Sequence, residues 1–184
     1  MVFTDTDLAR WGVEDGLRPF VGAYINPASV DLCWSGRVRE ARQDHVVVSL
    51  KDIRQMNSNE REAQIAAMFL PEVDVDSFVL CPGKFYLIST REYIRIPRNA
   101  VGLLAVKSTV GRLGLEHLHA GLFDPGFHGT GTLEVFMAAP WSLRIERGDP
   151  LIQMYLLETN GEPKRDYVEA GGHYAGQTGA EPAR

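Results

Sequence analysis

Short apolar runs separated by turn residues make up most of the chain from Ile25 onward. Runs of this kind, bounded by glycine, proline and aspartate, are typical of β-strands. Pro82-Gly83 and Asp124-Pro125-Gly126 supply the turn chemistry between them. About ten short strands are typical of a sandwich, barrel or jelly roll, so the pattern predicts a mainly β fold. The expected strands are residues 29–33, 46–50, 77–81, 85–89, 93–96, 102–106, 132–137, 142–145 and 151–157.

Two segments have helical instead of β character. Residues 4–11 place threonine and aspartate before apolar positions at helical spacing, which predicts a short opening helix. Residues 59–70 are rich in good helix formers, open with Asn59 and stop before Pro71, so they predict a helical insertion in the β pattern. Residues 159–184 are polar and glycine-rich, which is typical of a mobile tail.

Length and composition indicate one globular domain. The 184 residues fit a single apolar core, expected over residues 1–158, and 45 % hydrophobic with 23 % charged residues is the balance of a soluble folded protein. No apolar stretch reaches the roughly 18 residues of a membrane span, and residues 1–5 lack the basic and apolar regions of a signal peptide. We therefore expect a cytoplasmic protein.

The net charge limits the kinds of partner. It is −5, from 19 Lys and Arg against 24 Asp and Glu, which excludes bulk attraction to nucleic acid polymers or anionic membranes. A small anionic ligand would need a local basic cluster. Cys33 and Cys81 provide neither a disulfide framework nor the paired spacing of a zinc site, and both are expected to be buried thiols.

Residues 106–115 offer such a cluster. A strand ends there in Ser108-Thr109 and a short helical turn begins, with Lys107 and Arg112 close by. Free backbone N–H groups, hydroxyls and two cations together suit a phosphate. A hydroxyl-capped turn with two solvated cations explains the same pattern equally well.

Two acidic residues follow this segment. Asp124 precedes a Pro-Gly turn, where an aspartate commonly caps its own backbone. Glu134 shares one face of an expected strand with Thr132 and Phe136, opposite the apolar residues between them. A carboxylate there lies either on a solvated face or in a polar pocket, and a pocketed carboxylate is a candidate general base.

The histidines give only a weak metal signal. His117 and His119 would point the same way on a strand, but the sequence places no third ligand beside them. The His-x-Glu and Pro-Cys-x-x-Cys signature of zinc deaminases is absent, so a deamination by this chain would be zinc-free.

Four ordered segments resemble the dCTP deaminase family, within the wider dUTPase-like superfamily of trimeric, β-rich enzymes. They are residues 25–32, 107–115, 124–134 and 173–179, so the resemblance extends over most of the chain. It implies a distorted jelly-roll or β-barrel fold with a few short helices, whose tail closes over the active site. It also implies a homotrimer with shared active sites, and a dCTP or related pyrimidine nucleotide bound with Mg²⁺ and without zinc.

The resemblance further implies roles for individual residues. Glu134 matches the catalytic glutamate, which takes a proton from water and returns protons to the pyrimidine ring and the leaving ammonia. Ser108 and Arg112 match residues that position the water and this glutamate. Asp124 matches an acid near the sugar 3′-hydroxyl, and Phe127 matches an aromatic ring under the deoxyribose. The other substrate-binding residues implied are Lys107, Thr109, Val110, Gly111, Thr132, Leu133, Tyr167, His173, Tyr174 and Gln177.

Three positions depart from the family pattern. Lys107 stands where arginine is usual, which keeps the charge but gives up bidentate phosphate geometry. His119 stands where threonine is usual, and His173 where lysine is usual. These departures favour a modified cytosine substrate or a reduced activity.

We therefore expect zinc-independent deamination of dCTP to dUTP and ammonia, with Glu134 as the proton shuttle. Glu134 replaces the aliphatic residue of simple dUTPases, although bifunctional members keep both acids. The alternatives are a dUTP or dCTP diphosphatase, a bifunctional deaminase-diphosphatase, and a catalytically silent nucleotide-binding protein.

Overall fold

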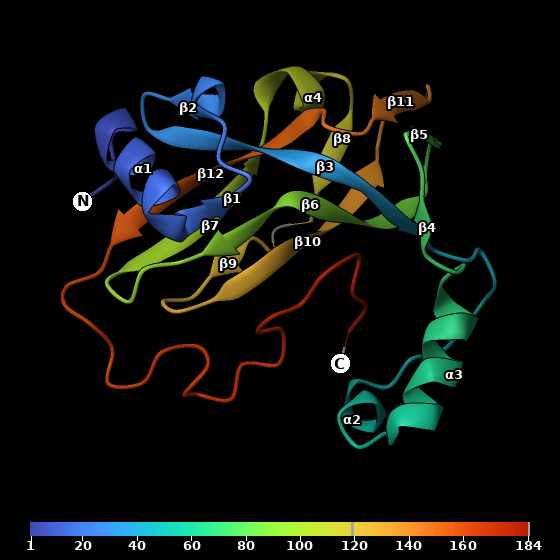
Figure 1. Ribbon diagram of the computed structural model, residues 1–184. Helices are drawn as coiled ribbons and strands as arrows, with labels where there is room; N and C mark the ends of the chain where they lie inside the picture. The colour runs from blue at the N-terminus through green and yellow to red at the C-terminus, as the bar shows by residue number, and fades with distance from the viewer. Residues whose placement is uncertain (119, 184) are drawn as a thin grey trace.

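The computed structural model describes residues 1–118 and 120–183 and has a curled antiparallel sheet with a few short helices (Figure 1). This arrangement confirms the predicted mainly β fold. Three short strands extend the main sheet: β1 (Leu17–Arg18) pairs with β6 (Phe85–Arg95), whereas β2 (Ile25–Asn26) and β4 (Val73–Asp74) pair with β3 (Ser29–Glu40). A separate pair joins β5 (Ser77–Leu80) to β11 (Leu143–Glu146). The central path of the main sheet is β8 (Leu115–His117), β10 (His128–Met137), β6 (Phe85–Arg95), β3 (Ser29–Glu40), β12 (Pro150–Glu158), β7 (Ala100–Val106) and β9 (Leu122–Phe123).

A bend in β3 allows this strand to pair with both halves of the curled sheet. Its first part pairs with β12 and its second part with β6. The register with β6 shifts between Trp34 and Val38, and Gly36 within this interval has a φ of 101°. Glycine adopts this left-handed conformation without steric cost, and an irregularity of this kind bends a long strand.

Alternation along β10 separates the core from the opposite face. Leu133, Val135 and Met137 are buried in the hydrophobic core. Thr132 and Glu134 lie on the other face and are half-buried. The alternation predicted from the sequence is therefore confirmed, and Glu134 does not lie on a fully solvated surface.

Both predicted helices are present. The opening helix is α1 (Asp5–Trp11), which begins with a capping box. The helix expected at residues 59–70 is α3 (Ser58–Met68), and Asn57 caps it instead of Asn59. Together with α2 (Leu50–Ile53) it stands at one side of the sheet near β4 (Figure 1). Among the described residues, none of the helices is both long and apolar enough to cross a membrane. The other helical elements are η1 (Gly12–Gly16), η2 (Gly22–Tyr24), α2 (Leu50–Ile53) and α4 (Ser108–Arg112).

The prediction of a strand at residues 46–50 is wrong. Val47 is 82 % exposed and Leu50, where α2 begins, is 68 % exposed. A strand needs partners for its backbone N–H and C=O groups, and this connection between β3 and α2 pairs with no strand in the described part of the chain. Its apolar residues therefore follow a strand pattern without forming a strand.

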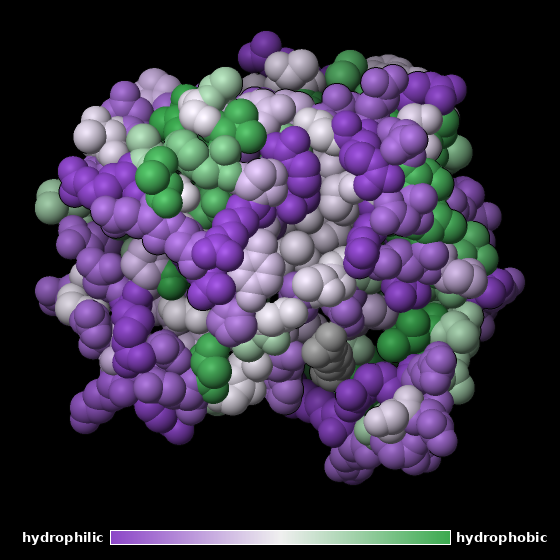
Figure 2. All heavy atoms as spheres, in the orientation of Figure 1, coloured by the Kyte–Doolittle hydropathy of each residue, from purple (hydrophilic) through white to green (hydrophobic). Residues whose placement is uncertain are grey.

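The C-terminal segment after β12 has neither helix nor strand in its described part, residues 159–183. It runs along the side of the sheet that carries β9 and β10 (Figure 1), and Gln177 forms an isolated parallel bridge with Gly129 of β10. On the molecular face in Figure 2, hydrophilic side chains dominate and apolar ones gather in several separate patches.

Candidate active site

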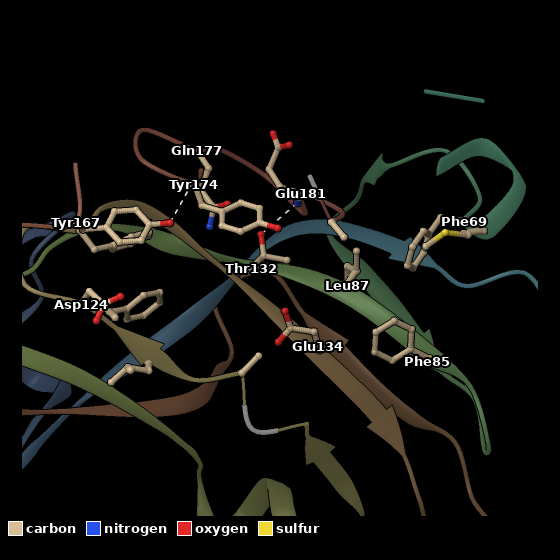
Figure 3. A pocket seen from close by; sticks show the side chains of 16 residues that line it. Phe69, Phe85, Leu87, Asp124, Thr132, Glu134, Tyr167, Tyr174, Gln177 and Glu181 are labelled. Carbon is tan, nitrogen blue, oxygen red and sulfur yellow. Dashed lines mark hydrogen bonds between the residues drawn. The ribbon is translucent and has the colours of Figure 1, made fainter. Parts of the chain in front are cut away.

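A cavity of about 480 Å³ lies between β9, β10 and the C-terminal segment (Figure 3). Phe69, Phe85 and Leu87 line one end of it, and Glu134 projects into its middle (Figure 3). Apolar walls with a few convergent polar groups are typical of small-molecule sites. The predicted site residues that line the cavity are Asp124, Phe127, Thr132, Glu134, Tyr167, Tyr174 and Gln177.

Glu134 combines access to the cavity with a buried oxygen. Its side chain is 30 % exposed, yet Oε2 is buried and has no hydrogen-bond partner among the described residues. Nε2 of His117 lies 3.5 Å from this oxygen. A half-buried carboxylate that lines a cavity can exchange protons with a molecule bound there.

The turn before β10 shapes the other end of the cavity. The Phe127 N–H donates to the Asp124 carbonyl at 3.0 Å, which confirms the predicted turn. Gly126 in this turn has a φ of 82°, and a Cβ at this position would lie 2.7 Å from Cβ of Asp166. Glycine is therefore required both by the backbone conformation and by the close approach of the C-terminal segment.

Phe127 belongs to an aromatic cluster under this turn. Its ring stacks on Phe123 with centroids 4.5 Å apart and meets the ring of Tyr167 edge-on at 5.5 Å. Phe127 is only 4 % exposed. The cluster fixes the ring as a rigid wall of the cavity.

Hydrogen bonds from β10 hold the C-terminal segment over the cavity. The Thr132 hydroxyl donates to the Gly179 carbonyl and accepts from the Glu181 N–H, both at 3.1 Å. The Gln177 side chain donates to the Thr130 carbonyl at 2.7 Å, and the Thr130 N–H donates to the Gln177 carbonyl at 3.0 Å. The strand that carries Glu134 therefore also supports the segment that covers it.

Arg98 anchors the start of the same segment. Its guanidinium lies 2.8 Å from the Asp166 carboxylate and 3.1 Å from that of Glu169. The backbone N–H of Asp166, and then the Arg98 guanidinium, hold the pKa of the Glu169 carboxyl below its ordinary value. The Tyr167 N–H donates to the Pro125 carbonyl at 2.8 Å, which ties this anchor to the turn before β10.

The central motif, residues 107–112, lies outside the cavity. The Ala138 N–H donates to the Gly114 carbonyl at 2.8 Å, and the Trp141 indole donates to the Leu113 carbonyl at 3.1 Å. These bonds place α4 beyond the end of β10, across the sheet from the C-terminal segment (Figure 1). Within one chain this motif therefore does not line the cavity that holds Glu134, and its part in a site shared between chains stays a prediction. The residues concerned are Lys107, Ser108, Thr109, Val110, Gly111 and Arg112.

Lys107 is already engaged by a carboxylate. Its ammonium pairs with Asp31, which is 6 % exposed and also accepts a hydrogen bond from the Asn26 side chain at 2.9 Å. By contrast, Ser108 and Arg112 are exposed on α4. The two cations of the motif therefore have different surroundings, and Arg112 is the more accessible one.

Two further predicted positions do not contribute side chains to the cavity. Leu133 is 2 % exposed and packs into the core on the opposite face of β10. His173 is exposed and does not line the cavity. His119 lies outside the described residues.

The described residues contain no group of three or more His, Cys, Asp or Glu side chains that could hold a metal ion. The expectation of Mg²⁺ bound through the triphosphate stays a prediction.

The dCTP deaminase-like family matches residues 5–159 of the chain. The chain belongs to this family. The dUMP-forming dCTP deaminase of Rhodococcus erythropolis is 34 % identical over 175 residues, which cover 92 % of this chain and 87 % of that protein. The dUMP-forming dCTP deaminase of Mycolicibacterium paratuberculosis is 33 % identical over 196 residues, which cover 100 % and 95 %. The predicted family, and with it the prediction of an enzyme, are confirmed.

A solved family structure supports the fold. The 2′-deoxycytidine 5′-triphosphate deaminase of Agrobacterium tumefaciens superposes with a TM-score of 0.65 and 20 % sequence identity. The match covers 84 % of this chain and 47 % of that chain, so this family member spans about half the length of the solved one.

The family relatives correct the expected product. Both of the relatives named above are dUMP-forming, whereas we expected a deaminase that stops at dUTP. That expectation is wrong, and the bifunctional alternative agrees better with these relatives. The sequence could not distinguish a deaminase that stops at dUTP from a bifunctional deaminase-diphosphatase, because Asp124 and Glu134 are compatible with both.

The position of His117 could not be predicted from the sequence. The spacing of His117 and His119 gave only a weak metal signal, whereas in the structure His117 lies beside Glu134. The contact joins β8 to β10, and His117 pairs in register with Val135, the neighbour of Glu134. Only the pairing of these two strands would have revealed it.

Proposed function

We propose that this enzyme converts dCTP to dUMP by two additions of water, one at C4 of the cytosine and one at the α-phosphorus. The single observation that carries the proposal is the near full-length similarity to dUMP-forming dCTP deaminases. The cavity supports it, because both carboxylates that such chemistry would use, Asp124 and Glu134, line it together.

Glu134 serves the deamination in this proposal. It takes a proton from the water whose oxygen bonds to C4 and passes that proton to the ring nitrogen N3. Glu134 then takes the proton of the new C4 hydroxyl group and delivers it to the amino group, the C4–N bond breaks as the C4=O bond forms, and ammonia leaves. A single carboxyl group that works in both directions supplies an acceleration of about 10²–10⁴ by general acid–base catalysis.

Asp124 serves the phosphate cleavage. It lies at the far end of the cavity from Phe85, across Glu134 (Figure 3). As a carboxylate it can accept a proton from the water that attacks the α-phosphorus, while the bond to the bridging oxygen breaks and diphosphate leaves. Bound with the nucleotide, Mg²⁺ would neutralise phosphate charge, and the phosphate oxygens would be its main ligands.

The complete site is formed by more than one chain, as in the expected homotrimer. Ser108 and Arg112 are exposed on α4 and do not line the cavity of their own chain, so they can complete the cavity of a neighbour. Exposed large apolar residues flank this region, which is typical of an interaction surface. They are Leu113 and Trp141.

The experiment is a product analysis. The purified protein is incubated with dCTP and Mg²⁺, and ammonia, diphosphate and dUMP are measured in the same samples; dUTP is tested separately. Equal amounts of ammonia and diphosphate from dCTP support the proposal. Ammonia with dUTP and without diphosphate contradicts it, and so does nucleotide binding without any product.

A further inference from the structure

His117 is a buried titratable residue with no assigned task. Its side chain is 3 % exposed, and its Nε2 lies 3.5 Å from Oε2 of Glu134. Both atoms are buried and neither has a hydrogen-bond partner among the described residues. Buried polar atoms are nearly always paired, so two facing atoms without partners call for a functional explanation.

The fold fixes the two side chains relative to each other. The Leu118 N–H donates to the Glu134 carbonyl at 2.9 Å, which joins the strands at this point. A Cβ at Gly121 would lie 3.1 Å from Cε1 of His117 and 2.9 Å from Cβ of Leu104. The absence of a side chain at Gly121 therefore leaves the space in which the imidazole ring lies.

We propose that His117 is a positioning residue for Glu134. A movement of about 0.5 Å brings Nε2 and Oε2 to the ordinary N–H···O distance of roughly 3.0 Å. The Nε2–H group then donates to Oε2, stabilises the carboxylate anion and fixes its orientation. The other carboxylate oxygen, Oε1, remains to exchange protons with water and substrate. This inference rests on the proposed role of Glu134 in deamination.

The expected effect is on turnover and not on nucleotide binding. His117 does not line the cavity, so its replacement leaves the contacts of the nucleotide with the cavity wall in place. Loss of the donor leaves Glu134 misoriented for both proton transfers. We expect kcat to fall by at least about tenfold, part of the 10²–10⁴ that general acid–base catalysis contributes, with KM for dCTP within about twofold.

The test compares His117→Gln with His117→Leu. Glutamine retains an N–H group near the position of Nε2, whereas leucine has a similar size and no donor. Ammonia release from dCTP by the wild-type protein is measured first, and its absence defeats the proposed function instead of this inference. We expect kcat of His117→Gln to stay within about threefold of wild type, and kcat of His117→Leu to fall by at least about tenfold.

Equal kcat values in the two folded variants overturn the inference, whether both are high or both are low. Thermal unfolding shows whether the variants are folded. If His117→Leu does not fold, His117→Asn replaces it, because asparagine places its amide near Nδ1 instead of Nε2. The inference then predicts a high kcat only for His117→Gln, and an equally active His117→Asn contradicts it.

Discussion

Glu134 owes its place to the register of β10. The residue falls on the face opposite Leu133 and Val135, so that a buried strand presents a carboxylate to the cavity. A shift of the strand by one residue would exchange the two faces and bury the acid in the core. The packing of the core therefore determines that the Glu134 carboxylate faces the cavity.

At this scale we predict that Glu134→Gln abolishes ammonia release, with a loss in kcat of at least about 10²-fold. Glutamine has nearly the same shape but cannot take a proton from water at neutral pH. Binding of dCTP, measured by calorimetry, should stay within a fewfold of wild type. Glu116→Gln, at an exposed position of β8, is the matched control. Substantial ammonia release by Glu134→Gln would remove this residue from the proton-transfer role.

At the scale of elements, β10 and the C-terminal segment act together. Thr132 holds the segment through two hydrogen bonds, to Gly179 and Glu181, while Glu134 lies two residues further along the same strand. A neutral hydrogen bond contributes about 0.5–1.5 kcal/mol net to stability. Loss of the Thr132 hydroxyl therefore weakens the attachment of the C-terminal segment over the cavity without unfolding the domain.

We predict that Thr132→Val raises KM for dCTP several-fold and makes the C-terminal segment more sensitive to limited proteolysis. Valine keeps the volume of threonine and lacks only the hydroxyl. Thr178→Val, at an exposed position of the same segment, is the control. Two variants with the same KM and the same cleavage rate would show that these bonds do not support the segment.

Elements that depend on local pattern could be predicted from the sequence. The alternation along β10 and the turn from Asp124 to Phe127 follow from period-two patterning and from the Pro-Gly pair. The exposed run at residues 46–50 could not be excluded, because apolar residues do not reveal whether a partner strand exists. The proximity of His117 to Glu134 and the distance of α4 from the cavity depend on strand pairing between remote segments, which no local pattern contains.

At the scale of the whole molecule, the proposed reaction requires sites shared between chains. Arg112 does not line the cavity of its own chain that holds Glu134, although the family resemblance gives both residues a role in the reaction. A closed trimer built from copies related by rotation would bring α4 of one copy to the cavity of the next.

Mixed trimers test this arrangement. Arg112→Ala and Glu134→Gln are each expected to be inactive, yet after co-refolding at equal amounts about a quarter of the sites receive an intact Arg112 from one chain and an intact Glu134 from the other. We predict about that fraction of wild-type ammonia release. An inactive mixture whose trimers are confirmed by light scattering would show that each site is built within one chain.

In the proposed reaction two water molecules react with one dCTP, at C4 and at the α-phosphorus. The most direct measurement is mass spectrometry of the nucleotide formed from dCTP in ¹⁸O-labelled water. Two additions of water give dUMP that carries two ¹⁸O atoms, one on the uracil ring and one on the phosphate. Singly labelled dUTP as the end product, or dUMP labelled on the ring alone, would contradict it.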